Sequence, residues 1–266
     1  ALTALGEDIT SFDGVNLIAD ICSHEDLVAS ANNVVYALIA LDEADISNEV
    51  LRASGSSWTR AQLVCALLSF QNPDGGFTID AGGASNIDMT AMALQALAPY
   101  VDDDACAVDL ASNGQPSVAS AVDNALGFLR GQMNGLCDFG SVESNAQVLL
   151  ALVALGRDPV NSKNGFATGA NSLISAICAY EVADGKGYAH TMGSDGKPGN
   201  ANALATVQAL RALSAYKSAG SGVSWSKIGG VKAGVVEPGG SIKPVTPEVP
   251  VPTVPTKNPT PAVMPT

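Results

Sequence analysis

A repeat of nearly sixty residues constrains the fold of this chain more than any other feature. The dipeptide Ala-Leu recurs at Ala37, Ala96, Ala151 and Ala209, so that successive copies lie 59, 55 and 58 residues apart. The surrounding segments are NNVVYALIAL, MTAMALQALAPY, SNAQVLLALVALG and NALATVQALRALSAY, and their apolar residues fall at helical spacing. A repeat of this length indicates units of secondary structure that stack on one another.

A second set of helices is predicted between these copies, in the segments TRAQLVCALLSFQ, VASAVDNALGFLRGQM and ANSLISAICAYE. Each is followed by a Gly-rich turn with one aromatic residue, namely NPDGGF, NGLCDFG and ADGKGY. The polar residues that we expect to cap the repeat helices are Asp88, Ser144 and Asn200. Two helices and a turn form a helical hairpin, which cannot cover its apolar face alone. The chain is therefore predicted to be all-α, with hairpins that stack or close into a ring.

The turn QNPDGGF at residues 71–77 has a structural and a functional interpretation. Gly75 and Gly76, after Asp74, give a turn in which positive φ costs little. Gln71 can hydrogen-bond exposed carbonyls or turn amides at the helix end, and Phe77 can fold back onto the hairpin. The alternative is that Asp74 binds a metal ion or a substrate. We favour the structural role, because a helical hairpin needs such a turn.

The C-terminal part of the chain differs from the rest in composition. From Glu237 onward the sequence contains nine of its 14 prolines, which predicts an extended Pro/Thr-rich linker over 237–266 and one domain over 1–236. The net charge of −13 argues against nucleic acid or anionic membrane surfaces as partners. No apolar run approaches the roughly 20 residues that a membrane span requires.

Two neighbouring motifs carry a resemblance to a known superfamily. Gln71-x-x-Asp74-Gly75-Gly76-Phe77, followed by Asp88-x-Thr90-Ala91-x-Ala93-Leu94, resembles the QW-type repeat of the terpenoid cyclase and protein prenyltransferase α/α toroids. The segments around the later copies are similar to bacterial secreted surface proteins of that superfamily. The resemblance covers about residues 1–220. It implies a prenyltransferase-like toroid, which in such proteins often lies beside a cobalamin-binding-like module. Transcobalamins use the same toroid.

The resemblance also implies that the toroid is partial. A closed toroid of this superfamily has six hairpins, whereas about four can be counted here. The opening ALTALGEDI mirrors ALVALGRDP at 151–159, which is the predicted end of a helix. We therefore expect the chain to begin inside a helix, with one or more upstream helices missing.

The motifs of the superfamily's enzymes are incomplete in this chain. Cyclases use Asp-x-Asp-Asp, whereas residues 102–104 lack the fourth-position Asp and are predicted to form a solvated acidic loop or a weak calcium contact. Prenyltransferases hold zinc with an Asp-x-Cys pair and a His. Asp88 matches the Asp, but Thr90 occupies the thiolate position, and no His lies around Asn200. The Cys-Gly-Glu-Gln motif of thioester domains is absent.

A glycosidase would need two carboxyl groups on either side of a sugar bond. Five carboxylates fall near the Gly-rich turns or the repeat-helix starts, namely Asp80, Asp88, Asp138, Glu143 and Asp195. The sequence singles out no pair among them, and helix capping accounts for two of them equally well.

A binding role remains, at the predicted mouth where the repeat helices begin. That mouth would present Asp88, Thr90, Ser144, Asn145, Tyr188, His190, Asn200 and Asn202. Short polar side chains and unpaired helix amides suit a polar ligand, a glycan edge or a peptide. The alternative is that these residues serve only as caps and their neighbours.

The sequence thus predicts a non-catalytic binding or adhesion module of a bacterial surface protein, located outside the cell. Its expected partners are a protein or a glycan at the cell surface and further domains of the same polypeptide. We expect no metal or resident cofactor. The alternatives are binding of a corrinoid together with an adjacent module, a calcium contact, and a prenyltransferase-like, cyclase-like or glycan-active enzyme.

Overall fold

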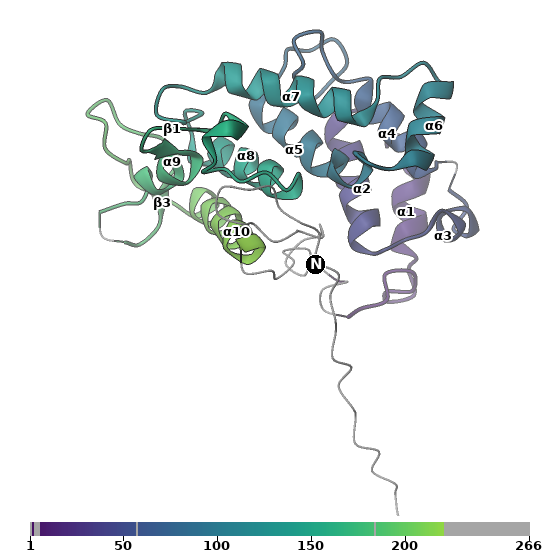
Figure 1. Ribbon diagram of the computed structural model, residues 1–266. Helices are drawn as coiled ribbons and strands as arrows, with labels where there is room; N and C mark the ends of the chain where they lie inside the picture. Colours follow the sequence, from purple (N-terminus) through teal and green to yellow (C-terminus); the bar gives the residue numbers. More distant parts are fainter. Residues whose placement is uncertain (1, 3–5, 57, 184, 221–266) are drawn as a thin grey trace, which may run out of the picture.

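The computed structural model describes residues 2, 6–56, 58–183 and 185–220, and the chain is predominantly helical there, as the repeat predicts (Figure 1). The α-helices are α1 (Leu17–Ser23), α2 (Ala31–Glu43), α3 (Asn48–Ala53), α4 (Arg60–Leu68), α5 (Ile87–Leu97), α6 (Asp104–Ser112), α7 (Val118–Gln132), α8 (Val142–Ala154), α9 (Leu173–Ala179) and α10 (Ala203–Gly220). The predicted linker 237–266 and most of the predicted helix end at the start of the chain lie outside the described residues.

Short elements fill some of the connections between these helices. They include two 3₁₀ helices, η2 (Ala98–Tyr100) and η3 (Ser162–Asn164). They also include four two-residue strands, β1 (Ala167–Thr168), β2 (Asn171–Ser172), β3 (Tyr188–Ala189) and β4 (Ala201–Asn202). The strands pair antiparallel as β1 with β2 and β3 with β4. The second pairing brings the turn after α9 against the start of α10.

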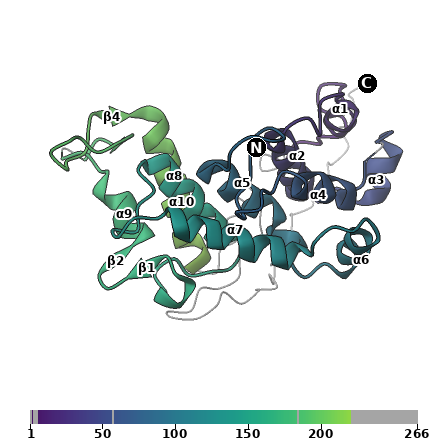
Figure 2. The same ribbon diagram turned by 90° about the horizontal axis from the view of Figure 1, so that it is seen from above.

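The four helices that carry the Ala-Leu repeat form one curved row. In chain order, α2 packs on α5, α5 on α8, and α8 on α10 (Figures 1 and 2). The face of α10 toward α8 is built from alanines, and Ala205, Ala209 and Ala212 are fully buried. The distance between packed helices depends on the side chains at their contact, so these small residues let the two helices approach closely.

We call α4, α7 and α9 the outer helices. They pack on the repeat helices in a grouping that the sequence did not predict. α4 packs on α2, α7 on α5 and α9 on α8, so each outer helix lies closest to the repeat helix that precedes it. The sequence pattern grouped each outer helix with the repeat helix that follows its Gly-rich turn. The turn therefore carries the chain from one helix pair to the next. The repeat pattern could not distinguish the two groupings, because both place the same segments at the same spacing.

A chain of glutamine side chains joins three helices of the row. The Gln95 amide donates to Oε1 of Gln147 at 3.0 Å, and the Gln147 amide donates to Oε1 of Gln208 at 3.3 Å. Gln95 is only 4% exposed, and buried amides are almost always hydrogen-bonded. These contacts fix α5, α8 and α10 relative to one another along their axes.

The caps of the repeat helices lie close to the predicted ones but not at them. Asn86 caps α5, Ser141 caps α8, and the Asn202 side chain accepts from the Ala205 amide at the start of α10. The predictions of Asp88, Ser144 and Asn200 as caps were therefore wrong. Several polar residues stand at each helix start, and the position of the preceding turn decides which of them is the cap. None of the described helices combines the length and the hydrophobicity needed to cross a membrane.

Candidate functional site

One polar side chain in the first turns of α5 holds the Gly-rich turn before that helix. The Thr90 hydroxyl accepts a hydrogen bond from the backbone amide of Phe77 at 2.8 Å and donates to the carbonyl of Asn86 at 2.7 Å. Phe77 is fully buried. The contact therefore satisfies a buried amide and fixes the aromatic residue in the core.

The same contact recurs at the starts of α8 and α10. Oδ1 of Asn145 accepts from the Phe139 amide at 2.9 Å, and the Thr206 hydroxyl accepts from the Tyr188 amide at 2.9 Å. In each helix this residue lies four positions after the polar residue at the helix start, and each aromatic ring is at most 8% exposed. We call Thr90, Asn145 and Thr206 the latch residues.

Three of the predicted ligand-binding residues therefore belong to the scaffold. Thr90 and Asn145 are 0% exposed, Tyr188 is 8% exposed, and the polar groups of the first two are already bonded within the chain. A side chain in this position cannot contact a ligand without breaking the turn. The sequence could not distinguish latch residues from ligand-binding residues, because polar residues of both kinds would stand close together in the first turn of each helix.

The turn at 71–77 is attached to the neighbouring unit by Gln71. Its amide donates to the carbonyl of Gly75 at 2.9 Å and to that of Ala121 in α7 at 2.8 Å. Asp74 accepts from the Gly76 amide at 3.0 Å and from the Ser85 hydroxyl at 2.7 Å. Both bonds are made to Oδ1, so one Asp74 oxygen is occupied by contacts within the connection between α4 and α5.

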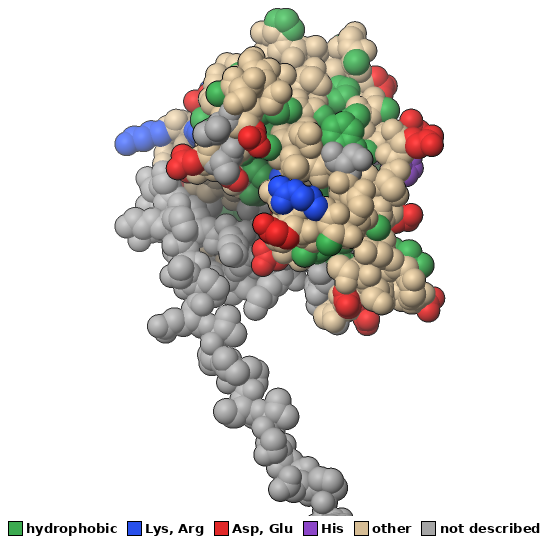
Figure 3. Space-filling view, turned by 90° about the vertical axis from the view of Figure 1, so that its right-hand side faces the viewer, with side chains coloured by type: hydrophobic (Ala, Val, Ile, Leu, Met, Phe, Trp, Pro, Cys, Tyr) green, Lys and Arg blue, Asp and Glu red, His purple; other side chains and the backbone are tan. Residues whose placement is uncertain are grey.

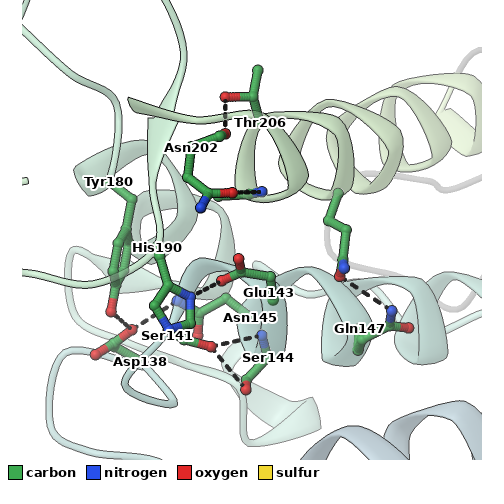
Figure 4. A network of polar contacts seen from close by, with 12 residues as sticks. Asp138, Ser141, Glu143, Ser144, Asn145, Gln147, Tyr180, His190, Asn202 and Thr206 are labelled. Atoms are coloured by element: carbon green, nitrogen blue, oxygen red, sulfur yellow. Dashed lines mark hydrogen bonds and ion pairs between the residues drawn. The ribbon is translucent and has the colours of Figure 1, made fainter. Parts of the chain in front are cut away.

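A second polar network surrounds Asp138 before α8 (Figure 4). Oδ1 accepts from the Asn145 amide at 2.7 Å and from the Tyr180 hydroxyl at 2.8 Å, while Oδ2 accepts from Asn134 at 3.2 Å. Burial, together with the bond to Asp138, raises the pKa of Tyr180. Three protein donors already occupy this carboxylate. One of them, Tyr180, lies at the end of α9, so the carboxylate ties α9 to the turn before α8.

At the surface beside this network, His190 meets Glu143. His190 Nδ1 lies 2.8 Å from Glu143 Oε2, and the His190 carbonyl accepts from the amide of Val142 at 3.2 Å (Figure 4). The Glu143 side chain is 13% exposed, whereas that of His190 is 59% exposed. The carboxylate thus orients an imidazole that presents its other edge to solvent, where it can contact a polar ligand.

Asp88 occupies the position in α5 that Glu143 occupies in α8, two residues after the cap. Its Oδ1 atom is buried and has no hydrogen-bond partner in the described part of the chain. The same is true of Oε1 of Glu43, at the end of α2. Burial raises the pKa of Glu43 from 4.5 to about 7, and the Asp42 carboxylate adds to the shift. Native proteins leave few buried polar atoms unpaired, so both carboxyl groups are candidates for ligand contact.

The remaining predicted site residues lie at or near the surface. Ser144 accepts a hydrogen bond from the Ser141 hydroxyl at 3.0 Å, and Asn200 and Asn202 are exposed. The acidic segment 102–104 begins a helix, with Asp103 as the cap of α6, where a loop was predicted. Within the described residues, no group of three or more His, Cys, Asp or Glu side chains is arranged to hold a metal ion.

Comparison with known proteins gives one informative similarity. No protein-family model matches the chain. The chain is 30% identical over 185 residues to the drimenyl diphosphate synthase of Streptantibioticus cattleyicolor, and the match covers 65% of this chain and 31% of the synthase. This chain therefore spans less than a third of that relative. The similarity and the helical fold fit the terpenoid cyclase superfamily.

Some residues of the site were not identified from the sequence. Thr206 could have been found, because it follows Asn202 at the same spacing as Thr90 follows Asn86. Glu143 was only one of five possible catalytic carboxylates, and nothing local linked it to His190. That pairing joins residues 47 apart in the chain, so only the packing of α8 against the turn after α9 reveals it.

Proposed function

We propose that this chain is part of an α/α toroid and acts as a non-catalytic binding or adhesion module of a bacterial surface protein. Its ligand is a polar partner, a glycan edge or a peptide, held on the rim where the repeat helices begin. We place Asp88, Ser144, His190, Asn200 and Asn202 on that rim. The Pro/Thr-rich segment separates the module from further domains of the same polypeptide.

The observation that carries this proposal is the His190–Glu143 pair. A largely buried carboxylate orients an exposed imidazole at 2.8 Å, beside Ser144 and next to the start of α10. Histidine and short hydroxyl or amide side chains offer both donors and acceptors, which suits hydroxyl-rich or amide-rich ligands. The latch residues beneath the rim hold these groups in place, so a ligand meets a preformed surface.

A thermal-shift screen tests the proposal with four probes, namely chitohexaose, cyanocobalamin, farnesyl diphosphate and calcium chloride. A ligand at about 100 times its dissociation constant adds about 2.7 kcal/mol to the stability of the native state. We expect chitohexaose to raise the melting temperature, and His190→Ala to reduce that rise. His24→Ala is the matched control, because it removes the chain's other histidine from an exposed position in a different region.

The outcomes separate the candidate functions. A shift with chitohexaose that survives His190→Ala as fully as His24→Ala would place the ligand elsewhere and contradict the proposed rim. A shift with cyanocobalamin would support the corrinoid alternative instead. Stabilisation by farnesyl diphosphate would favour the second candidate function below.

The second candidate is a cyclase-like activity on a prenyl diphosphate. It is supported by the similarity to a drimenyl diphosphate synthase and by the unpaired, buried Oδ1 atom of Asp88. A buried carboxyl oxygen that no described protein group occupies is a candidate for contact with a bound substrate. In this role Asp88 would contact the bound substrate.

Incubation with farnesyl diphosphate tests this candidate, with products analysed by mass spectrometry. Turnover that is lost in Asp88→Asn but retained in Asp74→Asn would establish the activity and overturn the non-catalytic proposal. Asp74 is a suitable control, because Oδ1 of its carboxyl group is already bonded to Gly76 and Ser85. Absence of turnover in the wild-type chain would remove this candidate for the chain as it stands.

A further inference from the structure

One helix of the fold, α6, is held mainly by a single neighbour. α6 packs on α4, and within the residues that the structure describes no other helix or strand contacts α6 as closely (Figures 1 and 2). Its buried side chains, Cys106 and Leu110, are 5% and 1% exposed and lie four positions apart, on one face. The other α6 residues whose burial is described are exposed. A narrow contact of this kind gains from a covalent bond across it.

Cys65 lies on the α4 side of this contact. A cavity of about 270 Å³ is lined by Cys65 from α4 and by Asp109 and Asn113 from the C-terminal part of α6 and the residue after it. Asp109 follows Cys106 by three positions, and residues three or four apart share one side of a helix. Cys65 also packs against the apolar core to which Cys106 belongs. The side of α6 that carries Cys106 is therefore turned toward Cys65.

The electrostatics of the two thiols agree with this placement. Burial raises the pKa of Cys106 to about 11, and the charges of Cys65 and of two neighbouring aspartates add to the shift. Burial also raises the pKa of Cys65, and Asp109 adds to that shift. Cys65 therefore lies near both residues of α6. Neither thiolate is stabilised, whereas a stabilised thiolate is what makes a catalytic disulfide easy to reduce. A bond between these sulfurs would resist reduction.

All five cysteines of the chain lie among the described residues, and there they are free thiols. We propose that Cys65 and Cys106 form a disulfide site, at which oxidation joins α4 to α6 covalently. The bond closes a loop of about 40 residues that contains α5. Such a link stabilises the native state by restricting the unfolded chain. The site is independent of the proposed binding rim, although the proposed location outside the cell is one in which disulfides persist.

The reaction needs an oxidant that reaches Cys65, and the cavity gives it access. The Cys65 thiolate attacks one sulfur of a low-molecular-weight disulfide, and the other sulfur leaves as a thiolate. The Cys106 thiolate then attacks the Cys65 sulfur and releases the second thiolate. Two thiols of the chain are thus oxidised, and one small disulfide is reduced to two thiols. The protons that the two cysteines lose are taken up by the two released thiolates.

The charge around the cavity determines which oxidant is suitable. Figure 3 shows the right-hand side of Figure 1, where α6 and α3 lie, and acidic side chains outnumber basic ones on this face. Asp109 also lines the cavity. An acidic surface repels anions, so an uncharged disulfide should enter more readily than an anionic one such as glutathione disulfide. Hydroxyethyl disulfide is uncharged and small, and it is the oxidant used below.

Oxidation of the purified chain by hydroxyethyl disulfide tests the site. Cys178→Ser serves as the parent chain, because Cys178 is exposed and would otherwise react by itself. We expect the parent to lose two thiols, measured with a chromogenic thiol reagent after denaturation. A peptic digest at low pH, where thiol exchange is slow, should contain Cys65 linked to Cys106. Adding Cys65→Ser to the parent should abolish this product. Adding Cys22→Ser is the matched control, because it removes a thiol from α1 and leaves the pair intact.

Thermal unfolding tests whether the bond holds α6 on α4. The oxidised parent should melt about 5 °C or more above the same chain in dithiothreitol. The chain with Cys65→Ser should melt at one temperature under both conditions, and circular dichroism verifies that it keeps its helices.

Three results would overturn the proposal. They are a parent that keeps all its thiols, a linked peptide that joins a different pair, and a linked chain that melts no higher than the reduced one. These measurements involve no ligand, so their failure can be told apart from a failure of the proposed binding rim.

Discussion

The turns before α5 and α8 have the same backbone but different side chains. In the first, the Asn72 amide donates to the Gly76 carbonyl and the Gly75 amide to the Asn72 carbonyl. In the second, Asn134, Asp138 and Cys137 make the corresponding bonds. Gly75 and Cys137 both have positive φ, at 88° and 61°. The backbone hydrogen bonds are thus the repeated feature, and the side chains on them are free to differ.

The side chains on the rim above each turn also differ between the two helices. The position two residues after the cap is Asp88 in α5, with an unpaired oxygen, and Glu143 in α8, bound to His190. The position four residues after the cap is a latch residue in both helices. The comparison teaches that the latch positions maintain the fold, while the positions between them and the caps can change their chemistry. The predictions below test that division.

The largest effect is expected at Gly75. A Cβ atom there would lie 2.4 Å from the Asn124 carbonyl oxygen of α7, and φ is positive as well. Gly75→Ala should therefore destabilise the fold by about 3 kcal/mol, from backbone strain and overpacking together. Gly185 also has positive φ in the turn after α9, but its nearest neighbour is a side-chain oxygen at 4.0 Å. Gly185→Ala should cost about 1 kcal/mol. Urea unfolding measures both, and equal losses would show that the approach of α7 is unimportant.

The second largest loss of stability is expected at the latch residues. Thr90→Val keeps the shape of the side chain but leaves the buried Phe77 amide unpaired, which should lower the free energy of unfolding by about 2 kcal/mol. Thr206→Val should cost about 1 kcal/mol, because its contact with the Tyr188 amide is only partly buried and water can replace it. Thermal and urea unfolding compare the two variants. A negligible change in Thr90→Val would contradict a structural role for this residue.

Glu43 extends the comparison to a carboxyl group that has no partner at one oxygen. Folded Glu43 keeps its proton to about pH 7, whereas the unfolded chain releases it near pH 4.5, so between these values the native state binds more protons. Its contribution to stability is complete below pH 4.5 and is lost as the pH rises to about 7. The difference in stability between wild type and Glu43→Gln should change by about 1 kcal/mol across this window, after allowance for solvent screening.

Urea unfolding of both proteins at several pH values measures this dependence. Comparing the wild type with Glu43→Gln at the same pH cancels the contribution of the other carboxyl groups, because these titrate in both proteins. A constant difference across the window would show that Glu43 ionises normally in the folded chain.

The smallest effect is expected at the rim itself. His190→Ala removes an exposed partner of Glu143, and exposed ion pairs contribute about 0–1 kcal/mol. Stability should fall by about 0.5 kcal/mol or less, in contrast to the latch variants. A loss as large as that of Thr90→Val would mean that His190 is part of the scaffold, and the division between rim and latch would fail.

The all-α class, the four repeat helices and the three Gly-rich turns could all be predicted from the sequence. Helical spacing, glycines and turn residues act over a few neighbouring positions, so they can be recognised without knowledge of the rest of the fold. The repeat of Ala37, Ala96, Ala151 and Ala209 also indicated that these helices stack. Their order in the row follows from that stacking.

Two features depend on the packing of the whole fold. One is the repeat helix on which each outer helix packs, and the other is which polar residue at a helix start is a cap, a latch or part of the rim. Asn86, Asp88 and Thr90 stand within five residues, and all three are polar. Their roles differ because the aromatic turn approaches from one side, where it meets Thr90 and leaves an oxygen of Asp88 unpaired. Contacts of this kind join segments that local spacing does not relate, so they depend on the packing of the whole row.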